Sequence, residues 1–498
     1  MASWQTLPAE MKLAVLDLLD NVDVRALATT QRSIYPLCIP SLFTKICLRD
    51  WQAISQFLQN VPSIYLSHTR SLELSTQAHD STTHPSQTDA VVRILTAAPR
   101  LHHLVLKLAG PLDKRVIPSF APMNRLKTLA IANCADENLL PISERFVVSV
   151  AATIPHLEEL SLDCISRSKL HVRDDERIPI YVPLVLGDSD IPDHPALGPA
   201  LNLPSLLTIP SLRKLHIHGT HLGDPAWASV PVHCKLHVLD LGACCHENDA
   251  ANRLCTERIM AAVGPTVDEF ALTTSVQDAK FAQKGVTPLQ KLRKLHISPF
   301  FPVESIVDTV ANLAGSPIES LSVQCYEEDV VDTCTAMEEF LSLRVERGPL
   351  FYDCLKTIHV TVAANDFDGD DGHDDDDVDG DDDGNDDADA DAKERREAVR
   401  RLQDFCNDLK LASEVGSRAA APTSVTPIGG RCAGAPAQDA QMGMGKCCSL
   451  PCGAEKGMEG AKGMGMGMGM GGDVGVGVDG EAEVGKHLNG RARHFSAL

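Results

Sequence analysis

The chain has 498 residues, of which 44% are hydrophobic and 23% are charged, and its formal net charge is −23. Residues 366–391 contain sixteen aspartates and no Lys or Arg, so the rest of the chain carries only about −7. A folded body with so little charge is poorly suited to neutralising phosphates, which argues against nucleic acid as the main partner.

The sequence predicts a protein of the cytoplasm, the nucleus or both. Its N-terminal residues lack the basic segment and apolar stretch of a secretory signal. No window approaches the roughly 18–20 uninterrupted apolar residues of a membrane-spanning helix. The sixteen cysteines are therefore expected to be reduced.

Residues 5–45 are expected to form a small helical module, called the hook below. Pro8 suits a first helical turn, and Glu10 complements the positive end of the helix dipole. Apolar residues then recur with helical spacing at Met11, Val15, Leu16, Leu18 and Leu19. Two further short helices are expected before residue 45. Such a module buries little apolar surface, so it needs a partner or a neighbouring domain; the alternative is a cap that closes the first repeat.

The pattern of the hook is carried by Leu7, Pro8, Glu10, Met11, Val15, Leu16, Leu19, Asp23, Val24, Leu27, Arg32 and Tyr35. It resembles the F-box motif of the F-box proteins that are common in filamentous and mushroom-forming fungi. In that family the motif docks onto a Skp-type adaptor, which links it to a cullin-RING ubiquitin ligase. The resemblance implies that the adaptor is contacted by Leu7, Pro8, Met11, Val15, Leu16 and Leu19.

A six-residue unit of the form L-x-x-L-x-L recurs through the middle of the chain. After a degenerate first copy at Thr69, its copies begin at Leu101, Leu126, Leu157, Leu212, Leu236, Val267, Leu292, Ile318 and Leu355. Most starts are separated by an interval near, or a little above, the 20–29 residues of a leucine-rich repeat. The longest interval, after Leu157, contains either one more unit at Tyr181 or an insertion.

Each unit predicts a strand whose leucines point inward, and residues 88–98, 144–154 and 303–314 have helical patterns between strands. A single strand–helix unit cannot bury its apolar face, so the units must stack. The predicted fold is therefore α/β: an irregular leucine-rich-repeat-like solenoid over residues 46–363, with parallel strands inside and helices outside. At one position of a leucine-rich repeat, the side chain satisfies backbone hydrogen bonds of the following turn. Three units have Cys134, Cys244 and Thr220 at this position, so the two cysteines are predicted to be structural.

The outward positions of the strands form the predicted binding face for a protein substrate. The candidate residues on this face are Lys127, Glu159, Arg213, His216, Asp240, Arg293, His296 and His359. We favour the simpler alternative that these charges pair across neighbouring strands, each pair contributing about 0–1 kcal/mol. His216 and His218 share one face of a strand, but no third ligand is defined, so no metal site is predicted.

No catalytic or cofactor-binding motif is found. The sequence lacks HExxH, GxSxG, the phosphate-binding loop GxxxxGK[ST] and a strand-flanked GxGxxG. Glu158 and Glu159 are adjacent on a strand and face opposite sides, which is poor geometry for an acid/base pair. The sequence therefore predicts a binding protein without enzymatic activity, cofactor or metal.

Three segments are predicted after the solenoid. Residues 364–392 form an acidic run that is expected to be disordered, because it repels itself and has little to bury. Residues 393–412 have the pattern of an amphipathic helix that either packs on the last repeat or binds a partner. Residues 413–498 form a Gly- and Met-rich tail of low complexity, also expected to be disordered.

The hook resembles an F-box motif and is followed by repeats. Together these features imply that the chain is the substrate-recognition subunit of a Skp–cullin–F-box ubiquitin ligase. In this interpretation the hook binds the adaptor and the repeats bind an unidentified protein substrate. Two alternatives stay open: a repeat scaffold without a ligase connection, and an acidic chaperone for basic proteins such as histones.

Overall fold

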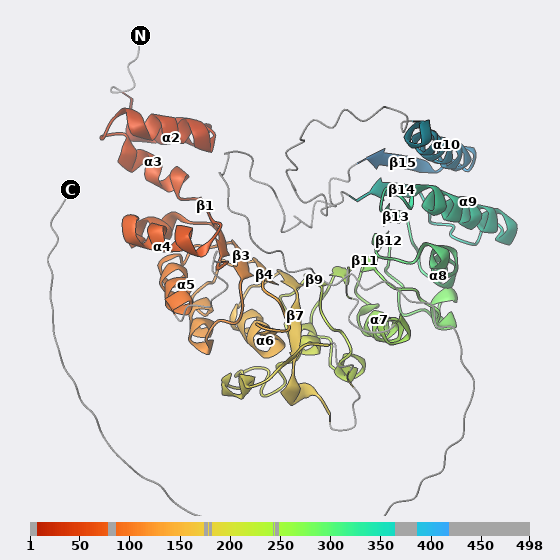
Figure 1. Ribbon diagram of the computed structural model, residues 1–498, viewed down its shortest axis with the longest axis horizontal. Coiled ribbons are helices and arrows are strands. Elements are labelled where there is room, and N and C mark those ends of the chain that lie inside the picture. The colour runs from red at the N-terminus through yellow and green to blue at the C-terminus, as the bar shows by residue number, and fades with distance from the viewer. Residues whose placement is uncertain are drawn as a thin grey trace, which may run out of the picture. The chain divides into compact units, whose positions relative to one another are not determined.

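The computed structural model describes residues 7–77, 86–173, 178, 182–242, 244, 249–363 and 386–417. The chain divides into two compact units, Met1–Ile428 and Gly429–Leu498, and every described residue belongs to the first. Figure 1 shows this first unit as a series of strands with helices beside them.

The hook consists of the helices α1 (Ala9–Leu16), α2 (Asn21–Thr30) and α3 (Tyr35–Leu42). The Asp20 carboxylate caps α2 by accepting a hydrogen bond of 2.8 Å from the amide of Asp23. The hook has a core of its own, separate from that of the solenoid, with the buried side chains Leu16, Val24, Ala28, Ile34 and Cys38. Five buried side chains make a small core, in keeping with the expectation that the hook depends on a neighbour or a partner.

The solenoid is built on one long parallel sheet of twelve strands among the described residues. The order across the sheet is the order in the chain: β1 (Lys45–Leu48), β2 (Ser71–Ser75), β3 (His103–Leu108), β4 (Thr128–Asn133), β6 (Glu159–Asp163), β9 (Lys214–His218), β10 (Val238–Asp240), β11 (Glu269–Leu272), β12 (Lys294–Ile297), β13 (Ser320–Cys325), β14 (Thr357–Val362) and β15 (Ala412–Ser417).

All ten strands that the repeat predicts are present, each beginning two residues after the start of its unit. In β3, Leu104 and Leu106 are fully buried, whereas His103 and Val105, which alternate with them, are only half-buried. The two leucines align with the buried Leu72 and Leu74 of β2. The alternation in the sequence therefore sets which residues face the core, as the repeat predicts.

The helices α4 (Trp51–Asn60), α5 (Ser86–Ala97), α6 (Glu144–Thr153), α7 (Asp249–Val263), α8 (Ile306–Asn312) and α9 (Val330–Arg347) lie on one side of the sheet (Figure 1). The helices expected at 88–98, 144–154 and 303–314 correspond to α5, α6 and α8, the last preceded by a 3-10 turn at Val303–Ser305. The fold is thus an α/β solenoid with strands on one side and helices on the other.

The long interval in the repeat contains an insertion. β6 pairs directly with β9, so no strand of the main sheet lies between them. A second, smaller sheet is formed instead by β5 (Ile142–Ser143), β7 (Ile165–Ser168) and β8 (Leu184–Val185). Tyr181, the start of the possible extra unit, lies outside the described residues, but Leu184 and Val185 from that unit belong to this smaller sheet.

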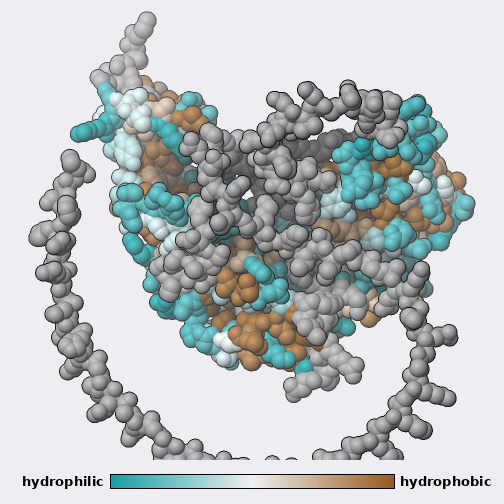
Figure 2. Space-filling view, in the orientation of Figure 1, coloured by the Kyte–Doolittle hydropathy of each residue, from teal (hydrophilic) through white to brown (hydrophobic). Residues whose placement is uncertain are grey.

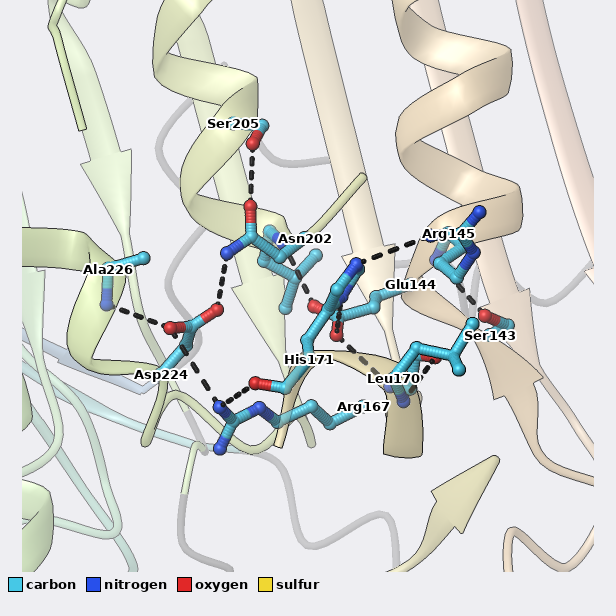
Figure 3. A network of polar contacts seen from close by, with 12 residues as sticks. Ser143, Glu144, Arg145, Arg167, Leu170, His171, Asn202, Ser205, Asp224 and Ala226 are labelled. Atoms are coloured by element: carbon cyan, nitrogen blue, oxygen red, sulfur yellow. Dashed lines mark hydrogen bonds and ion pairs between the residues drawn. The ribbon is translucent and has the colours of Figure 1, made fainter. Parts of the chain in front are cut away.

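Buried charged groups attach this insertion to α6 (Figure 3). Glu144, which is 1% exposed, accepts hydrogen bonds from the amides of Ser168 (3.0 Å) and Leu203 (2.9 Å). Its carboxylate also lies 2.8 Å from Nδ1 of His171. Next to it, Arg145 donates to the carbonyl of Ile191 at 3.0 Å. Because each buried charge has several partners, its desolvation is offset.

A second part of the network lies deeper in the insertion. Asp224 accepts hydrogen bonds from Nδ2 of Asn202 (2.5 Å) and from the amide of Ala226 (2.8 Å). Nη2 of Arg167 donates to the carbonyl of His171 at 3.0 Å and lies 3.8 Å from Asp224. Polar side chains therefore help to position the insertion, in addition to buried leucines such as Leu203 and Leu206.

The sheet continues beyond residue 363, where the sequence predicts the end of the solenoid. Helix α10 (Asp386–Asp408) packs against α9, and β15 pairs in parallel with β14. The expected amphipathic helix is thus present and belongs to a further strand–helix unit; residues 413–417, expected to be disordered, form part of its strand. Residues 386–392, which the sequence assigns to the disordered acidic run 364–392, instead form the first part of α10. The rest of that run, 364–385, and residues 418–498 of the tail lie outside the described residues.

Cys244 and Thr220 contact backbone groups near the turns of their repeats, as the sequence predicts. The thiol of Cys244 lies 3.1 Å from the carbonyl of Ile217, and Thr220 accepts from the amide of Ile165 at 3.1 Å. The prediction for Cys134 is wrong, because this residue is exposed. Its neighbour Asn133 is buried and caps the turn, accepting from the amide of Ala135 and donating to the carbonyl of Leu140.

Candidate functional site

The hook presents apolar side chains to solvent. Met11 is 54% exposed, Leu18 is 86% exposed and Val22 is 71% exposed. Met11 and Val15, at i and i+4, lie on one face of α1, while Leu18 lies in the turn after α1 and Val22 lies in α2. Figure 2 shows apolar surface on the hook, at the upper left of the view. A concentration of exposed apolar side chains on a small module is typical of a protein-binding surface.

The six residues that the resemblance assigns to adaptor binding differ in their exposure to solvent. Pro8, Met11 and Val15 are exposed and Leu7 is half-buried. Leu16 is 1% exposed, so the expectation that it faces a partner is wrong: it is buried by α2 and α3 in the core of the hook. Leu19 packs against the same core and is partly buried.

Sequence reasoning missed three apolar residues that the structure exposes, namely Leu13, Leu18 and Val22. Leu13 lies in α1, Leu18 in the turn after it and Val22 in α2, so no single helical spacing predicts the exposure of all three. The apolar pattern alone does not distinguish the inner face of α1 from its outer face, because both contain leucines. Only the packing of α2 and α3 decides between them.

A set of contacts joins the hook to the first strands. The ring of Phe43, directly after α3, lies 5.1 Å from the ring of Tyr65 and 6.5 Å from that of Phe57 in α4. The amides of Arg70 and Ser71 both donate to the carbonyl of Thr44. These contacts set the position of α3 relative to β1 and β2.

The candidate substrate residues lie in two places. Glu159, His216, Asp240, His296 and His359 lie on strands, at positions that alternate with buried leucine or isoleucine residues. Lys127, Arg213 and Arg293 lie one residue before a strand, at the edge of the sheet where the strands begin. The structure therefore places these eight residues on one strand face and its adjoining edge.

Most of these charges are paired across neighbouring strands. Nζ of Lys127 lies 2.7 Å from Glu158, and Nζ of Lys214 lies 3.4 Å from Glu159. Arg293 pairs with Glu319, which also pairs with Lys356. The pairing that we favour from the sequence is thus present at these positions. Arg213 instead donates to the carbonyls of Pro210 and Leu212.

His296 pairs with Glu269 through Nε2 at 3.0 Å, and Glu269 also accepts from Lys294 at 3.3 Å. The hydrogen bond from His296 is the main cause that lowers the pKa of Glu269; its burial opposes this, and the charges of His296 and Lys294 add to it. His359 is half-buried on β14. A face with both signs of charge in close pairs suits a protein surface better than a polyanion.

His216, His218 and Asp240 form a cluster near the middle of the sheet. The Asp240 carboxylate lies 3.3 Å from Nδ1 of His216 and 3.1 Å from Nε2 of His218. His216 is 2% exposed, so the expectation that it is available to a substrate is wrong in this structure. Its side chain is buried against Asp240, where the sequence predicts an open face.

Burial and hydrogen bonding shift the pKa values of Asp240 and His218 in opposite directions. Burial favours the neutral Asp240 carboxyl, but hydrogen bonds from His216 and His218 outweigh it and lower the pKa of Asp240 well below its usual value. Burial likewise lowers the pKa of His218, but the hydrogen bond and charge of Asp240 outweigh it, so the net pKa of His218 is raised. The cluster therefore favours a charged His–Asp pair.

In the described part of the chain no group of His, Cys, Asp or Glu side chains has the arrangement of a metal site. The eleven cysteines described there are free thiols. None of the described helices is both long enough and apolar enough to cross a bilayer.

No protein-family model matches this sequence, and no curated protein matches it. Among solved structures it is similar to the leucine-rich repeat-containing protein LegL7 from Legionella pneumophila, with 12% identity, 57% of this chain and 83% of that chain covered, and a TM-score of 0.31. It is also similar to the yeast complex of Rad7 and Elc1 (14% identity; 72% and 89% covered; TM-score 0.29). An internalin of Listeria monocytogenes matches at 13% identity, with 65% and 90% covered and a TM-score of 0.25.

These identities and TM-scores are low, so the fold assignment rests on the strand register of the chain itself. Ten repeated units each supply one strand to a single parallel sheet, and leucines from neighbouring units meet in one core. The chain therefore folds as an irregular leucine-rich-repeat-like solenoid preceded by a helical hook.

Proposed function

We propose that this protein is the substrate-recognition subunit of a Skp–cullin–F-box type ubiquitin ligase. In this proposal the hook binds a Skp-type adaptor and the strand face of the solenoid binds a protein substrate. The protein supplies proximity and orientation, while a separate enzyme of the cytoplasm or nucleus performs the ubiquitin transfer.

One observation carries the adaptor half of the proposal. The hook exposes Met11 and Val15 of α1, Leu18 of the following turn and Val22 of α2, although its own core contains only five buried side chains. A closing cap would instead turn its apolar residues toward the first repeat. Three of these exposed residues, Met11, Val15 and Leu18, lie within the part of the F-box resemblance that runs from Leu7 to Leu19.

The substrate half is supported by the strand face. Among the helices of the described chain, α4 to α9 all lie on the other side of the sheet (Figure 1). The face displays charged pairs such as Lys107 with Glu73 and Lys214 with Glu159. In the first pair, Nζ of Lys107 lies 2.8 Å from Oε1 of Glu73. Both pairs are half-buried and accessible to solvent at this face, so their charges can be redirected to a partner.

Affinity purification from the native host tests the adaptor half. We compare the wild-type chain with a Met11→Asp/Leu18→Asp double variant, which places charges at two of the exposed apolar positions of the hook. The matched control is Leu254→Asp on α7, where the side chain is 57% exposed but distant in sequence from the hook. Recovery of a Skp-type adaptor with wild type and control, and its loss with the double variant, supports the proposal.

The same purification distinguishes the two alternatives. If no adaptor accompanies the wild-type chain, the ligase connection is wrong and a repeat scaffold is the better interpretation. If histones or other basic proteins are recovered instead, and deletion of residues 366–391 abolishes their recovery, the acidic chaperone is favoured.

A charge swap tests the substrate half without removing an ion pair. The Lys214→Glu/Glu159→Lys double variant keeps opposite charges on neighbouring strands, so the fold should be preserved. Proteins that bind through this face should be lost from the purification while the adaptor stays. Unchanged recovery of every co-purifying protein other than the ligase subunits would contradict a role for this part of the face.

A further inference from the structure

A cavity of about 390 Å³ lies where the hook meets the beginning of the solenoid. Apolar lining is provided by Leu16 at the end of α1, by Leu19 three residues beyond it and by Pro40 in α3. The rest of the lining comes mainly from the edge at which the first strands begin. This volume falls within the range of roughly 300–1,000 Å³ that is typical of small-ligand sites.

The polar lining of the cavity is strongly basic. It includes Lys45, Arg70, Arg100 and Arg125, together with one carboxylate, Asp17. Lys45 is the first residue of β1 and Arg70 directly precedes β2, while Arg100 and Arg125 each lie three residues before a strand. The stacking of successive repeats therefore brings four cations from distant parts of the sequence to one end of the sheet.

These arginines differ from other cations along the same edge. Lys127 pairs with Glu158, and Arg293 and Lys356 both pair with Glu319. Arg70, Arg100 and Arg125 make no ion pair with any residue that the structure describes, and all three are exposed. In a chain with a net charge of −23, this is a local concentration of positive charge, with Asp17 as the one carboxylate in the lining.

Such an arrangement favours a bound anion. Cations that line one cavity repel one another, and an anion placed among them converts that repulsion into attraction. Guanidinium groups bind phosphate through two parallel hydrogen bonds, which a single carboxylate such as Asp17 cannot satisfy for several arginines. Ser41 adds a hydroxyl to the same lining.

We propose that this cavity binds a phosphate-type oxyanion that carries at least two negative charges. The ligand contacts arginines of the solenoid and, on the other part of the lining, the end of α1 and α3. It therefore bridges the hook and the first repeats and stabilises their joint. The proposal does not depend on binding of an adaptor, so it stands or falls separately from the proposed function.

Isothermal titration of the full chain with pyrophosphate, in phosphate-free buffer, tests the site. The test variant is Arg100→Gln/Arg125→Gln, and the control is Arg213→Gln/Lys356→Gln on the same edge outside the cavity lining. All four positions are at the surface, and thermal unfolding without ligand verifies that both variants fold. The wild type and the control should bind pyrophosphate, with weakening by NaCl. The test variant should bind at least roughly tenfold more weakly, because it loses two charge-assisted contacts.

A second titration distinguishes the two sources of such an oxyanion. A short peptide with two adjacent phosphoserines, flanked by Gly and Ala, is compared with pyrophosphate. Tighter binding of the peptide supports the site with a phosphorylated protein segment as its ligand; tighter binding of pyrophosphate supports the site with a small soluble phosphate. No binding of either probe to the wild type at millimolar concentration overturns the proposal, as does equal binding by the Arg100→Gln/Arg125→Gln variant.

Discussion

The ring of Phe43 lies 5.1 Å from the ring of Tyr65, and this contact joins the hook to the solenoid. Phe43 follows the last helix of the hook, whereas Tyr65 lies in a 3-10 helix (Ser63–His68) directly before β2. Aromatic pairs at this distance contribute about 0.5–1.5 kcal/mol beyond the area that they bury. The position of the hook relative to the first strands therefore depends in part on a few aromatic residues.

Replacing Phe43 by Ala should loosen this joint. We expect a loss of about 1–2 kcal/mol in the free energy of unfolding, less than the 3–5 kcal/mol of a fully buried phenylalanine, because Phe43 is half-buried. Hydrogen exchange of the amides in α1 to α3 should accelerate more than exchange in β9 to β14. Ile64→Ala is the control, since Ile64 is 71% exposed and should change stability by less than about 0.5 kcal/mol. Equal acceleration throughout the chain would show that Phe43 does not act locally.

Glu144 should be essential for attaching the insertion. Glu144→Ala leaves the amides of Ser168 and Leu203 without their acceptor, both in buried surroundings. We expect a cost of about 3–5 kcal/mol in urea-induced unfolding. The matched control is Glu158→Ala, which removes an exposed pair with Lys127 and should cost less than about 1 kcal/mol. Similar losses for the two variants would contradict the role given to the buried network.

The contribution of His218 to stability should depend on pH. Since its folded-state pKa is raised above the ordinary 6.5, the contribution is complete below that value and is lost as the pH rises through the higher folded-state pKa. The stability difference between wild type and His218→Gln should therefore be larger at about pH 6 than at about pH 9. In an Asp240→Asn background this pH dependence should disappear, because the partner that raises the pKa is gone. A difference that is constant with pH in the wild-type background would be the contrary result.

The position of the last repeat can be tested by truncation. A chain ending at residue 363 lacks α10 and β15 and loses the burial of Leu402, Cys406 and Leu411, while β14 becomes an open edge. We expect a fall in the melting temperature on the order of 10 °C and a tendency to self-associate. A chain ending at residue 417 keeps the twelve-strand sheet and should melt close to the wild type. If both truncated chains melt alike, α10 and β15 do not belong to the cooperative unit.

The strands of the solenoid were predictable because their signal is local. Leu104 and Leu106 alternate with residues that point away from the core. The six-residue unit therefore predicts both that the segment is a strand and which of its side chains are buried. β15 was not predictable in this way, since its sequence ASEVGS has only one large apolar residue. It is recognised as a strand only through its pairing with β14.

The sites were less predictable because they depend on long-range packing. The sequence contains the helical stripe of Met11 and Val15, but it does not reveal that Leu16 turns inward against α2 and α3. The basic cavity combines Lys45 with Arg125, residues eighty positions apart in the chain. No local pattern indicates that such residues meet. The buried state of His216 likewise follows from its neighbours in space rather than from its place on β9.

The most direct test of the central claim is a titration of the purified chain with the Skp-type adaptor of its host. We predict a one-to-one complex with an affinity in the micromolar range or tighter. The Met11→Asp/Leu18→Asp double variant should abolish binding, and Leu254→Asp should leave it unchanged. Circular dichroism should show that the double variant keeps its helices, because both side chains are exposed. Failure of the wild-type chain to bind the adaptor, or equal binding by the double variant, would contradict the assignment of the hook as a docking module.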